Sequence, residues 1–165
     1  MTTYDLDHLT FINKIELLYA EKSLKHSMKL DELLIAQLIP VISSEKMKLY
    51  DKHNNLVQFS EDGILYEINT YQGIESDHFS VGIRFNKYDY FMIRFDFGKT
   101  LRHTNNMNTE NEEIIEGSHL HFYSHTDKSV SKNVIPIDKL KKFIHLNCLA
   151  DTLQMVIQYT NIIIE

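Results

Sequence analysis

The alternation of apolar and polar residues between positions 64 and 123 is the feature that most constrains this chain. On a β-strand successive side chains point to opposite faces, so alternation marks a strand with one buried face. The pattern predicts strands over 64–71, 79–85, 90–97 and 117–123. Because the connections between the first three are short, we expect an antiparallel meander, with a tight turn at 86–89. We expect 117–123 to pair beside 90–97.

Weaker patterns complete the predicted fold. Short strands are expected at 47–50 and 56–59 around a turn at 51–55, and an edge strand at 134–137 that tolerates Pro136. Helical spacing predicts two N-terminal helices, one between residues 5 and 22 and one over 31–39 that Asp31 caps and Pro40 ends. A long C-terminal helix is predicted over 138–162. The polar stretch 98–116 is predicted to be a loop of roughly twenty residues without structure of its own.

Together these elements predict a single α+β domain over residues 1–165. Its helical segment is 5–39, its central antiparallel sheet is 46–137, and its N-terminal helices and long C-terminal helix pack on one face of the sheet. A chain of 165 residues with 43% hydrophobic content can bury such a core without disulfides. The one cysteine, Cys148, is expected to be a small buried hydrophobe inside the last helix.

Charge and the N-terminal sequence narrow the class of partner. The net charge of −6 disfavours binding to nucleic-acid backbones and leaves a protein partner as the expectation. The first residues lack the basic start and apolar run of a signal peptide, and no stretch approaches the ~20 apolar residues of a membrane span. We therefore expect a cytoplasmic protein that does not bind membranes.

The predicted alternation also collects the chain's ionisable side chains on one face of the sheet. The apolar face would hold Phe79, Val81, Ile83, Phe85, Phe91, Ile93, Phe95, Phe97, Leu120 and Phe122. The opposite face would hold Glu67, Asn69, Ser80, Gly82, Arg84, Met92, Arg94, Asp96, His119, His121 and Tyr123. Gly82 would leave room there for a ligand or for another part of the chain. The simplest interpretation is an ordinary solvated face.

Two kinds of chemistry remain open for that face. His119 and His121, two residues apart, can reach one divalent metal, with His103 or Asp96 as a third ligand. Without metal, one histidine could act as general base and the other as acid, while Arg84 or Arg94 stabilises a developing anion. The candidate catalytic residues are thus His119, His121, His103, Arg94 and Asp96. The candidate binding face adds Arg84, Tyr123 and Asn105, and no cofactor other than a divalent metal is expected.

Four short motifs resemble a family of short uncharacterised bacterial and phage proteins, a domain-of-unknown-function family. They read Arg94-x-Asp96, His103-x-Asn105, Gly117-x-His119-x-His121-x-Tyr123 and Val134-x-Pro136. The resemblance implies no established reaction. It does imply an accessory-genome gene, found among mobile and defence-related functions.

Two functions follow as hypotheses, and the sequence leaves open whether the protein is an enzyme. The first is a phage or mobile-element protein that blocks or regulates a host factor, such as a defence nuclease, by placing acidic surface in a basic groove. The second is a histidine-dependent nuclease or hydrolase of the toxin type that uses the face of His119 and His121. A DNA regulator would need a basic face on the N-terminal helices, which the sequence does not offer.

Overall fold

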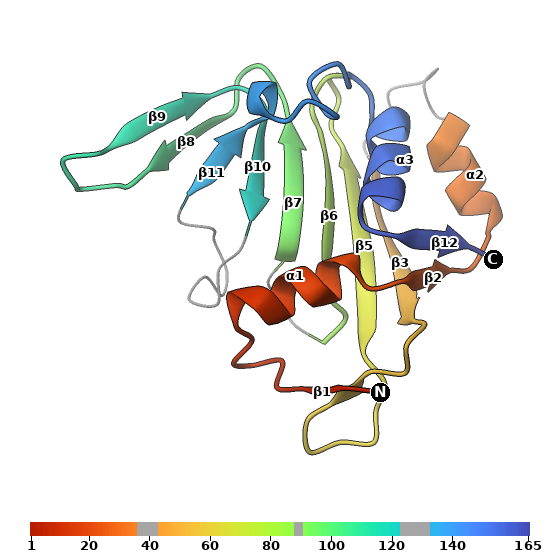
Figure 1. Ribbon diagram of the computed structural model, residues 1–165. Coiled ribbons are helices and arrows are strands. Elements are labelled where there is room, and N and C mark those ends of the chain that lie inside the picture. The colour runs from red at the N-terminus through yellow and green to blue at the C-terminus, as the bar shows by residue number, and fades with distance from the viewer. Residues whose placement is uncertain (36–42, 88–90, 123–132) are drawn as a thin grey trace.

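The computed structural model describes residues 1–35, 43–87, 91–122 and 133–165. In these residues eight strands form one large sheet, and three α-helices accompany it (Figure 1). The strands of that sheet are β2 (Lys22–Leu24), β3 (Ser43–Asp51), β5 (Leu65–Gln72), β6 (Phe79–Phe85), β7 (Phe91–Phe97), β10 (His119–Phe122), β11 (Val134–Pro136) and β12 (Ile162–Ile164). No helix in this part of the chain is long and apolar enough to cross a membrane.

The sheet has the order β11-β10-β7-β6-β5-β3-β2-β12, and all its pairs are antiparallel except β2 with β12. The predicted meander over β5, β6 and β7 is present, and β10 pairs beside β7 as predicted. In that register His119 lies opposite Asp96 and His121 opposite Arg94. The mixed α and β architecture with a mainly antiparallel sheet is therefore as the sequence indicates. Two of its strands were not predicted: β2 lies in the polar segment between the two predicted N-terminal helices, and β12 begins at the last residue of the predicted helix 138–162.

The start of β7 corrects one part of the predicted face pattern. A β-bulge shifts the register, so that Ile83 pairs with Ile93 while Arg84 pairs with Phe91. Met92 is the extra residue and is buried in the core, whereas Phe91 joins the polar face. The Phe91 ring occupies the room that Gly82 leaves, because a Cβ on Gly82 would come within 2.6 Å of that ring. The predicted positions of Phe91 and Met92 were wrong because strict alternation assumes an unbulged strand.

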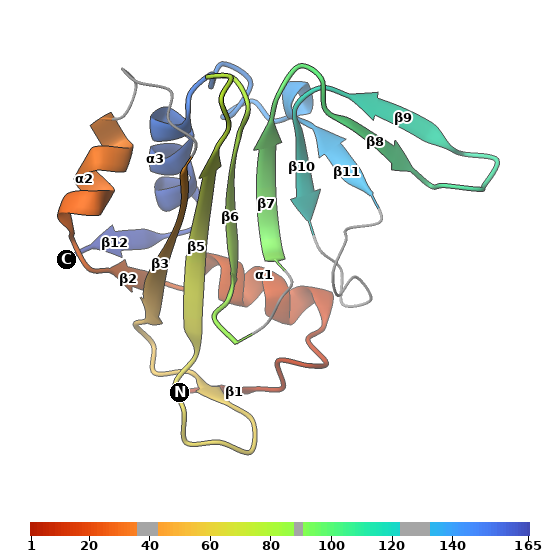
Figure 2. The same cartoon turned by 180° about the vertical axis from the view of Figure 1, so that it is seen from behind.

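The three α-helices lie on one face of the sheet in the two opposite views (Figures 1 and 2). Helix α1 (Phe11–Tyr19) begins at a capping box made by Thr10 and Asn13. In α2 (Met28–Ile35) the hydroxyl of Ser27 accepts the Leu30 amide, so Ser27 takes the capping role predicted for Asp31. The predicted helix end at Pro40 lies outside the described residues.

The C-terminal helix is shorter than predicted. Helix α3 spans Leu149–Tyr159, and the predicted first part of that helix is instead the 3-10 turn η1 (Ile137–Lys139) followed by turns. These turns still bury Phe143, which stacks on Phe95 with ring centroids 4.3 Å apart. The spacing of apolar residues over 138–148 therefore arises because these turns are partly buried, and it does not indicate a helix. Cys148 is a half-buried N-cap whose sulfur accepts the Asp151 amide, not a residue inside the helix.

The stretch 98–116 was predicted to be an unstructured loop and instead contains a β-hairpin. Its strands β8 (Arg102–Asn105) and β9 (Glu113–Glu116) pair with each other in a separate two-stranded sheet. Figure 1 shows this hairpin projecting away from the rest of the molecule beyond β10 and β11. We call residues 102–116 the arm. A second small sheet pairs β1 (Thr3–Tyr4) with β4 (Leu56–Val57).

Candidate functional site

The candidate site lies where the inner end of the arm meets strands β7 and β10. His119 and His121 project from β10 on the face opposite Leu120, and His103 comes from β8 of the arm. His119 and His121 are each only 4% exposed. The predicted face is therefore real, but it is not the open surface that the sequence led us to expect. We call the three histidines with Arg94 and Asp96 the histidine centre.

The three imidazole rings form one compact group. Ring centroids are 4.9 Å apart for His119 and His121, 5.4 Å for His103 and His121, and 5.8 Å for His103 and His119. One nitrogen of each ring lies within 4.8 Å of the corresponding nitrogens of the other two. Among the described residues this is the one group of three or more histidine, cysteine or acidic side chains with a spacing that could hold a metal ion.

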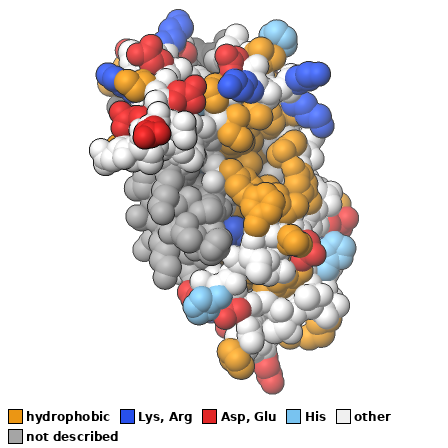
Figure 3. Space-filling model, turned by 60° about the vertical axis from the view of Figure 1, so that its left-hand side comes forward, with side chains coloured by type: hydrophobic (Ala, Val, Ile, Leu, Met, Phe, Trp, Pro, Cys, Tyr) orange, Lys and Arg blue, Asp and Glu red, His pale blue; other side chains and the backbone are white. Residues whose placement is uncertain are grey.

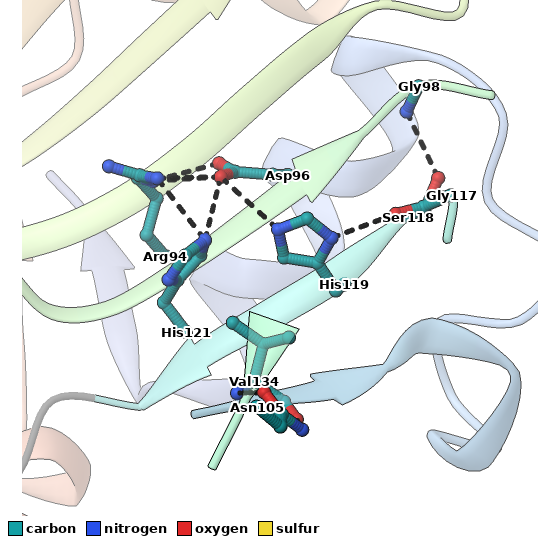
Figure 4. A network of polar contacts seen from close by, with 9 residues as sticks. All are labelled: Arg94, Asp96, Gly98, Asn105, Gly117, Ser118, His119, His121 and Val134. Carbon is teal, nitrogen blue, oxygen red and sulfur yellow. Dashed lines mark hydrogen bonds and ion pairs between the residues drawn. The ribbon is translucent and has the colours of Figure 1, made fainter. Parts of the chain in front are cut away.

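Asp96 links this group to an arginine (Figure 4). Its Oδ2 atom lies 2.7 Å from Arg94 Nη2, 3.0 Å from His121 Nε2 and 4.0 Å from His119 Nε2. Arg94 also donates from Nε to the same carboxylate, at 2.8 Å from Oδ1. Burial raises the pKa of Asp96, but hydrogen bonds from His121 and Arg94 more than offset this, so its pKa is below the ordinary value. The ionised Asp96 carboxylate thus lies beside the imidazoles of His119 and His121.

The other side of His119 is held by the chain just before β10. Its Nδ1 donates to the Gly117 carbonyl at 2.8 Å, which leaves Nε2 on the side of Asp96. Gly117 has φ +81°, a backbone angle that favours glycine and that aims this carbonyl back at the imidazole. Burial, together with the neighbouring His121 and His103, lowers the pKa of His119. His119 is therefore neutral at neutral pH, which is the form that binds metals.

The arm is fastened to the sheet by backbone-like contacts at Asn105, which pairs with Glu113 in the last strand pair before the turn. The Asn105 side chain donates to the Val134 carbonyl at 2.9 Å and accepts the Val134 amide at 2.8 Å. Asn105 thus pairs with the edge strand β11 as another strand would. Ile115, on the partner strand, is buried. These contacts cover the polar face of β10 and explain why its histidines are buried.

The outer part of the arm has the opposite character. Residues 106–114 are all exposed. The arm carries four exposed glutamates, Glu110, Glu112, Glu113 and Glu116, against one basic residue, Arg102. Figure 3 shows Asp and Glu side chains gathered in the upper left of the face on which the arm comes forward. Met107 and Ile114 add exposed apolar surface to the arm, at 63% and 46%.

A cavity of about 310 Å³ adjoins the histidine centre on the polar face of β5, β6 and β7. Arg94 and Asp96 contribute to its wall, together with Asn69, Ser80 and Phe91. The Asn69 Oδ1 atom is buried and has no hydrogen-bond partner among the described residues. His103, His119 and His121 are not among the residues that line the cavity. Arg94 and Asp96 therefore lie between the cavity and these three imidazoles.

The structure brings together all five predicted catalytic residues, His119, His121, His103, Arg94 and Asp96. The three residues predicted to extend the binding face have different outcomes. Arg84 pairs with Glu67 at 2.7 Å, and the Phe91 ring contacts the guanidinium groups of both Arg84 and Arg94. Asn105 holds the arm, and Tyr123 lies outside the described residues.

Sequence reasoning missed Gly117 as a positioning residue and the glutamates of the arm. The adjacent β-branched residues Ile114 and Ile115, preceded by an asparagine-rich turn, were the signal available for a second hairpin. It was outweighed by the overall polarity of 98–116. The glutamates were therefore assigned to a loop and not to an ordered element.

The chain belongs to DUF6978, a family of unknown function whose model matches residues 17–162. This agrees with the expected membership of a family of unknown function. No curated protein and no solved structure matches the chain. The function must therefore be argued from the geometry alone.

Proposed function

We propose that this protein acts by binding another protein, with the acidic arm as its contact element. One observation carries the proposal: Asn105 and Asn106 fasten the arm beside β11, whereas residues 107–114 beyond them are exposed on a projecting hairpin. A surface of four glutamates with exposed Met107 and Ile114 fits a basic groove that also has an apolar pocket. Proteins that bind nucleic acids present such grooves.

The arm is also ordered well enough to bind without a large entropic cost. Asn106 and Asn108 adopt left-handed backbone angles of +50° and +62°, which asparagine tolerates better than most residues. The Asn108 amide donates to Glu112 Oε2 at 2.8 Å, and Thr109 Oγ1 donates to the Asn106 carbonyl at 2.7 Å. A preformed tip loses less conformational freedom on binding than a loose loop would.

In this proposal the target is a host factor such as a defence nuclease, and the protein regulates or blocks it. The acidic arm occupies the groove in which the target would hold nucleic acid. A phage or mobile-element origin and a cytoplasmic location are predictions that come from the sequence, and the proposal is compatible with both. The histidine centre has no catalytic task in it, which fits the burial of His119 and His121.

The test is affinity capture with two matched charge-reversal variants. One replaces Glu110, Glu112 and Glu113 with lysine in the arm. The other replaces Glu32, Glu61 and Glu75, which are exposed acids on the body. A partner captured by the wild type should be kept by the body variant and lost by the arm variant.

The captured partner is then purified and its dissociation constant measured. Reversal of the arm should weaken binding at least tenfold, and added salt should weaken wild-type binding because it screens exposed charges. Equal binding by the arm variant and the body variant would refute the arm as the contact element.

The cavity supports a second candidate, the histidine-dependent hydrolase. Arg94 and Asp96 line the cavity and also contact His121, so a small anionic substrate there would lie beside a base and a cation. At about 310 Å³ the cavity suits a small molecule and not a duplex. Hydrolysis of a model phosphodiester that Asp96→Asn abolishes, with target binding retained, would favour this candidate over the first.

A further inference from the structure

We propose that His103, His119 and His121 bind one transition-metal cation of the zinc class, and that this cation fastens the arm to the sheet. Two of the ligands come from β10 and the third from β8, so the cation would add a link between the arm and the sheet to those made by Asn105 and by the contact of Asn106 with Asn133. Metal binding is independent of the arm's proposed partner. The fastening of the arm likewise does not require that partner, although its use in binding rests on the proposed function.

The spacing of the nitrogens carries the first step. A tetrahedral ion with metal–nitrogen bonds of about 2.0–2.1 Å separates its ligand nitrogens by roughly 3.3 Å. The three nitrogens of the histidine centre lie within 4.8 Å of one another, so modest rotations of the rings are enough to close on an ion. His119 and His121 alternate on one strand, and the pleat aims both at the same volume.

The surroundings of the rings carry the second step. Metal-binding histidines usually donate their other nitrogen to a carbonyl or carboxylate, which fixes the ring and its tautomer. His119 does this through Nδ1 to the Gly117 carbonyl, at 2.8 Å. His121 has the Asp96 carboxylate 3.0 Å from its Nε2. The negative charge of Asp96, which Arg94 shares at 2.7 Å, also offsets part of a cation's charge beside the two buried histidines.

The ligand type sets the class of ion. Neutral imidazoles suit zinc, copper, nickel and iron, whereas magnesium and calcium require oxygen ligands. Three histidines leave one position of a tetrahedral ion for another ligand. His119 and His121 are buried, which favours a structural role for the ion over an open catalytic one.

The first experiment is a titration of untagged protein, because a histidine tag would itself bind metal. The protein is treated with chelator, dialysed and titrated with Zn²⁺ and Co²⁺ by calorimetry and visible absorption. We expect one equivalent of each ion, and a Co²⁺ spectrum typical of tetrahedral nitrogen ligation. Substoichiometric or absent binding to the wild-type protein would overturn the proposal without any variant.

Variants then locate the site. His103→Ala should abolish the high-affinity equivalent, while His53→Ala, at an exposed turn histidine outside the centre, should keep it. Asp96→Asn, which changes a residue beside the ligands, should weaken binding by about 10–100-fold. Circular dichroism of each variant shows whether it folds. Binding by His103→Ala equal to that of His53→Ala would refute the proposed ligand set.

Hydrogen exchange separates the two halves of the proposal. Zinc should slow amide exchange across the β8–β9 hairpin in the wild type and leave it unchanged in His103→Ala. If zinc binds but the arm exchanges at the same rate, the metal site stands and the fastening of the arm is refuted. Failure of the capture experiment would refute the arm's partner and leave both metal results intact.

Discussion

Two buried polar groups lie towards opposite ends of the sheet, and they are satisfied in different ways. Lys22 on β2 is fully buried, and its ammonium group donates to the carbonyls of Leu18, Ala20 and Thr160 at 2.7, 2.7 and 3.3 Å. These carbonyls lie at the C-terminal ends of α1 and α3, where helices leave acceptors unpaired. The histidine centre is instead satisfied mainly by other side chains.

The difference shows which buried polar group the fold itself requires. Two helix ends converge on β2, and Lys22 supplies the donors that they lack, so its burial follows from the packing alone. No helix end or open edge requires His103, His119 and His121 to meet. Their partners come from three separate strands, β7, β8 and β10, at the base of a projecting arm. That arrangement is the better candidate for a function.

Removal of the Lys22 ammonium should have the largest effect on stability. Lys22→Met keeps the length and apolar stem but removes the donor of three carbonyls. Those of Leu18 and Thr160 belong to buried residues, and each buried acceptor left without a donor costs about 1–3 kcal/mol. We expect a loss of about 3 kcal/mol or more in urea unfolding. Lys25→Met, at an exposed lysine nearby, should change stability by less than about 0.5 kcal/mol. Similar stabilities for the two variants would show that Lys22 is not a structural cap.

The apolar side of the sheet should respond more evenly along its length. Phe143→Ala removes the ring stacked on Phe95, below the histidine centre, and Leu153→Ala opens a cavity under α3. Each should cost roughly 2–5 kcal/mol, as deletions of large core side chains do. Ile144→Ala and Gln154→Ala are exposed controls next to these residues. Unchanged melting of Phe143→Ala would mean that the turns over 138–148 do not support this end of the sheet.

The sequence was sufficient for the central strands β5, β6, β7 and β10 because alternation reports burial directly. The pairing of β10 with β7 and the meeting of His119, His121, Arg94 and Asp96 follow from strand periodicity. His103 joins them only because 98–116 folds back as a hairpin, and no local pattern specifies where a hairpin docks. Burial of the two histidines depends on that docking.

The burial of Lys22 also could not be predicted from the local sequence. It lies in a polar segment that reads as a linker between two helices, and lysine is rarely buried. Its burial depends on α1 and α3 ending at the same place, which is a property of the tertiary structure. The bulge at Met92 is likewise set by the pairing of two strands, and neither strand shows it alone.

The pH dependence of stability should distinguish Lys22 from His119, because the two side chains titrate in different pH ranges. Burial lowers the pKa of Lys22 to about 7, so between pH 7 and 10.5 the unfolded chain binds more protons and stability rises with pH. The pKa of His119 is also lowered, so its burial costs stability as the pH falls below 6.5. Each rise should be at most about 1.4 kcal/mol per pH unit for one proton. Urea unfolding with chelator, from pH 5 to 10, measures both.

Two variants show which residue causes the alkaline rise in stability and which causes the acid loss. Lys22→Met should flatten the alkaline rise and keep the acid loss, whereas His119→Phe should do the reverse. An alkaline rise that persists in Lys22→Met would contradict the assignment to Lys22. On the solvated face that the sequence predicts, histidine substitutions would leave the melting temperature nearly unchanged. Since both histidines are 4% exposed, His121→Ala should instead cost about 1–3 kcal/mol.

The smallest effect on stability is expected at the exposed tip of the arm. Asn108 has φ +62°, and alanine there should cost about 1 kcal/mol in the local equilibrium. Because residues 106–114 are exposed, that cost should appear as roughly fivefold faster amide exchange in the arm and not as a lower melting temperature. Asn111→Ala, in the same turn without a positive φ, is the matched control. If Asn108→Ala instead lowered the melting temperature of the whole protein, the arm would be part of the cooperative fold. The contrast between a structural end and a functional end of the sheet would then fail.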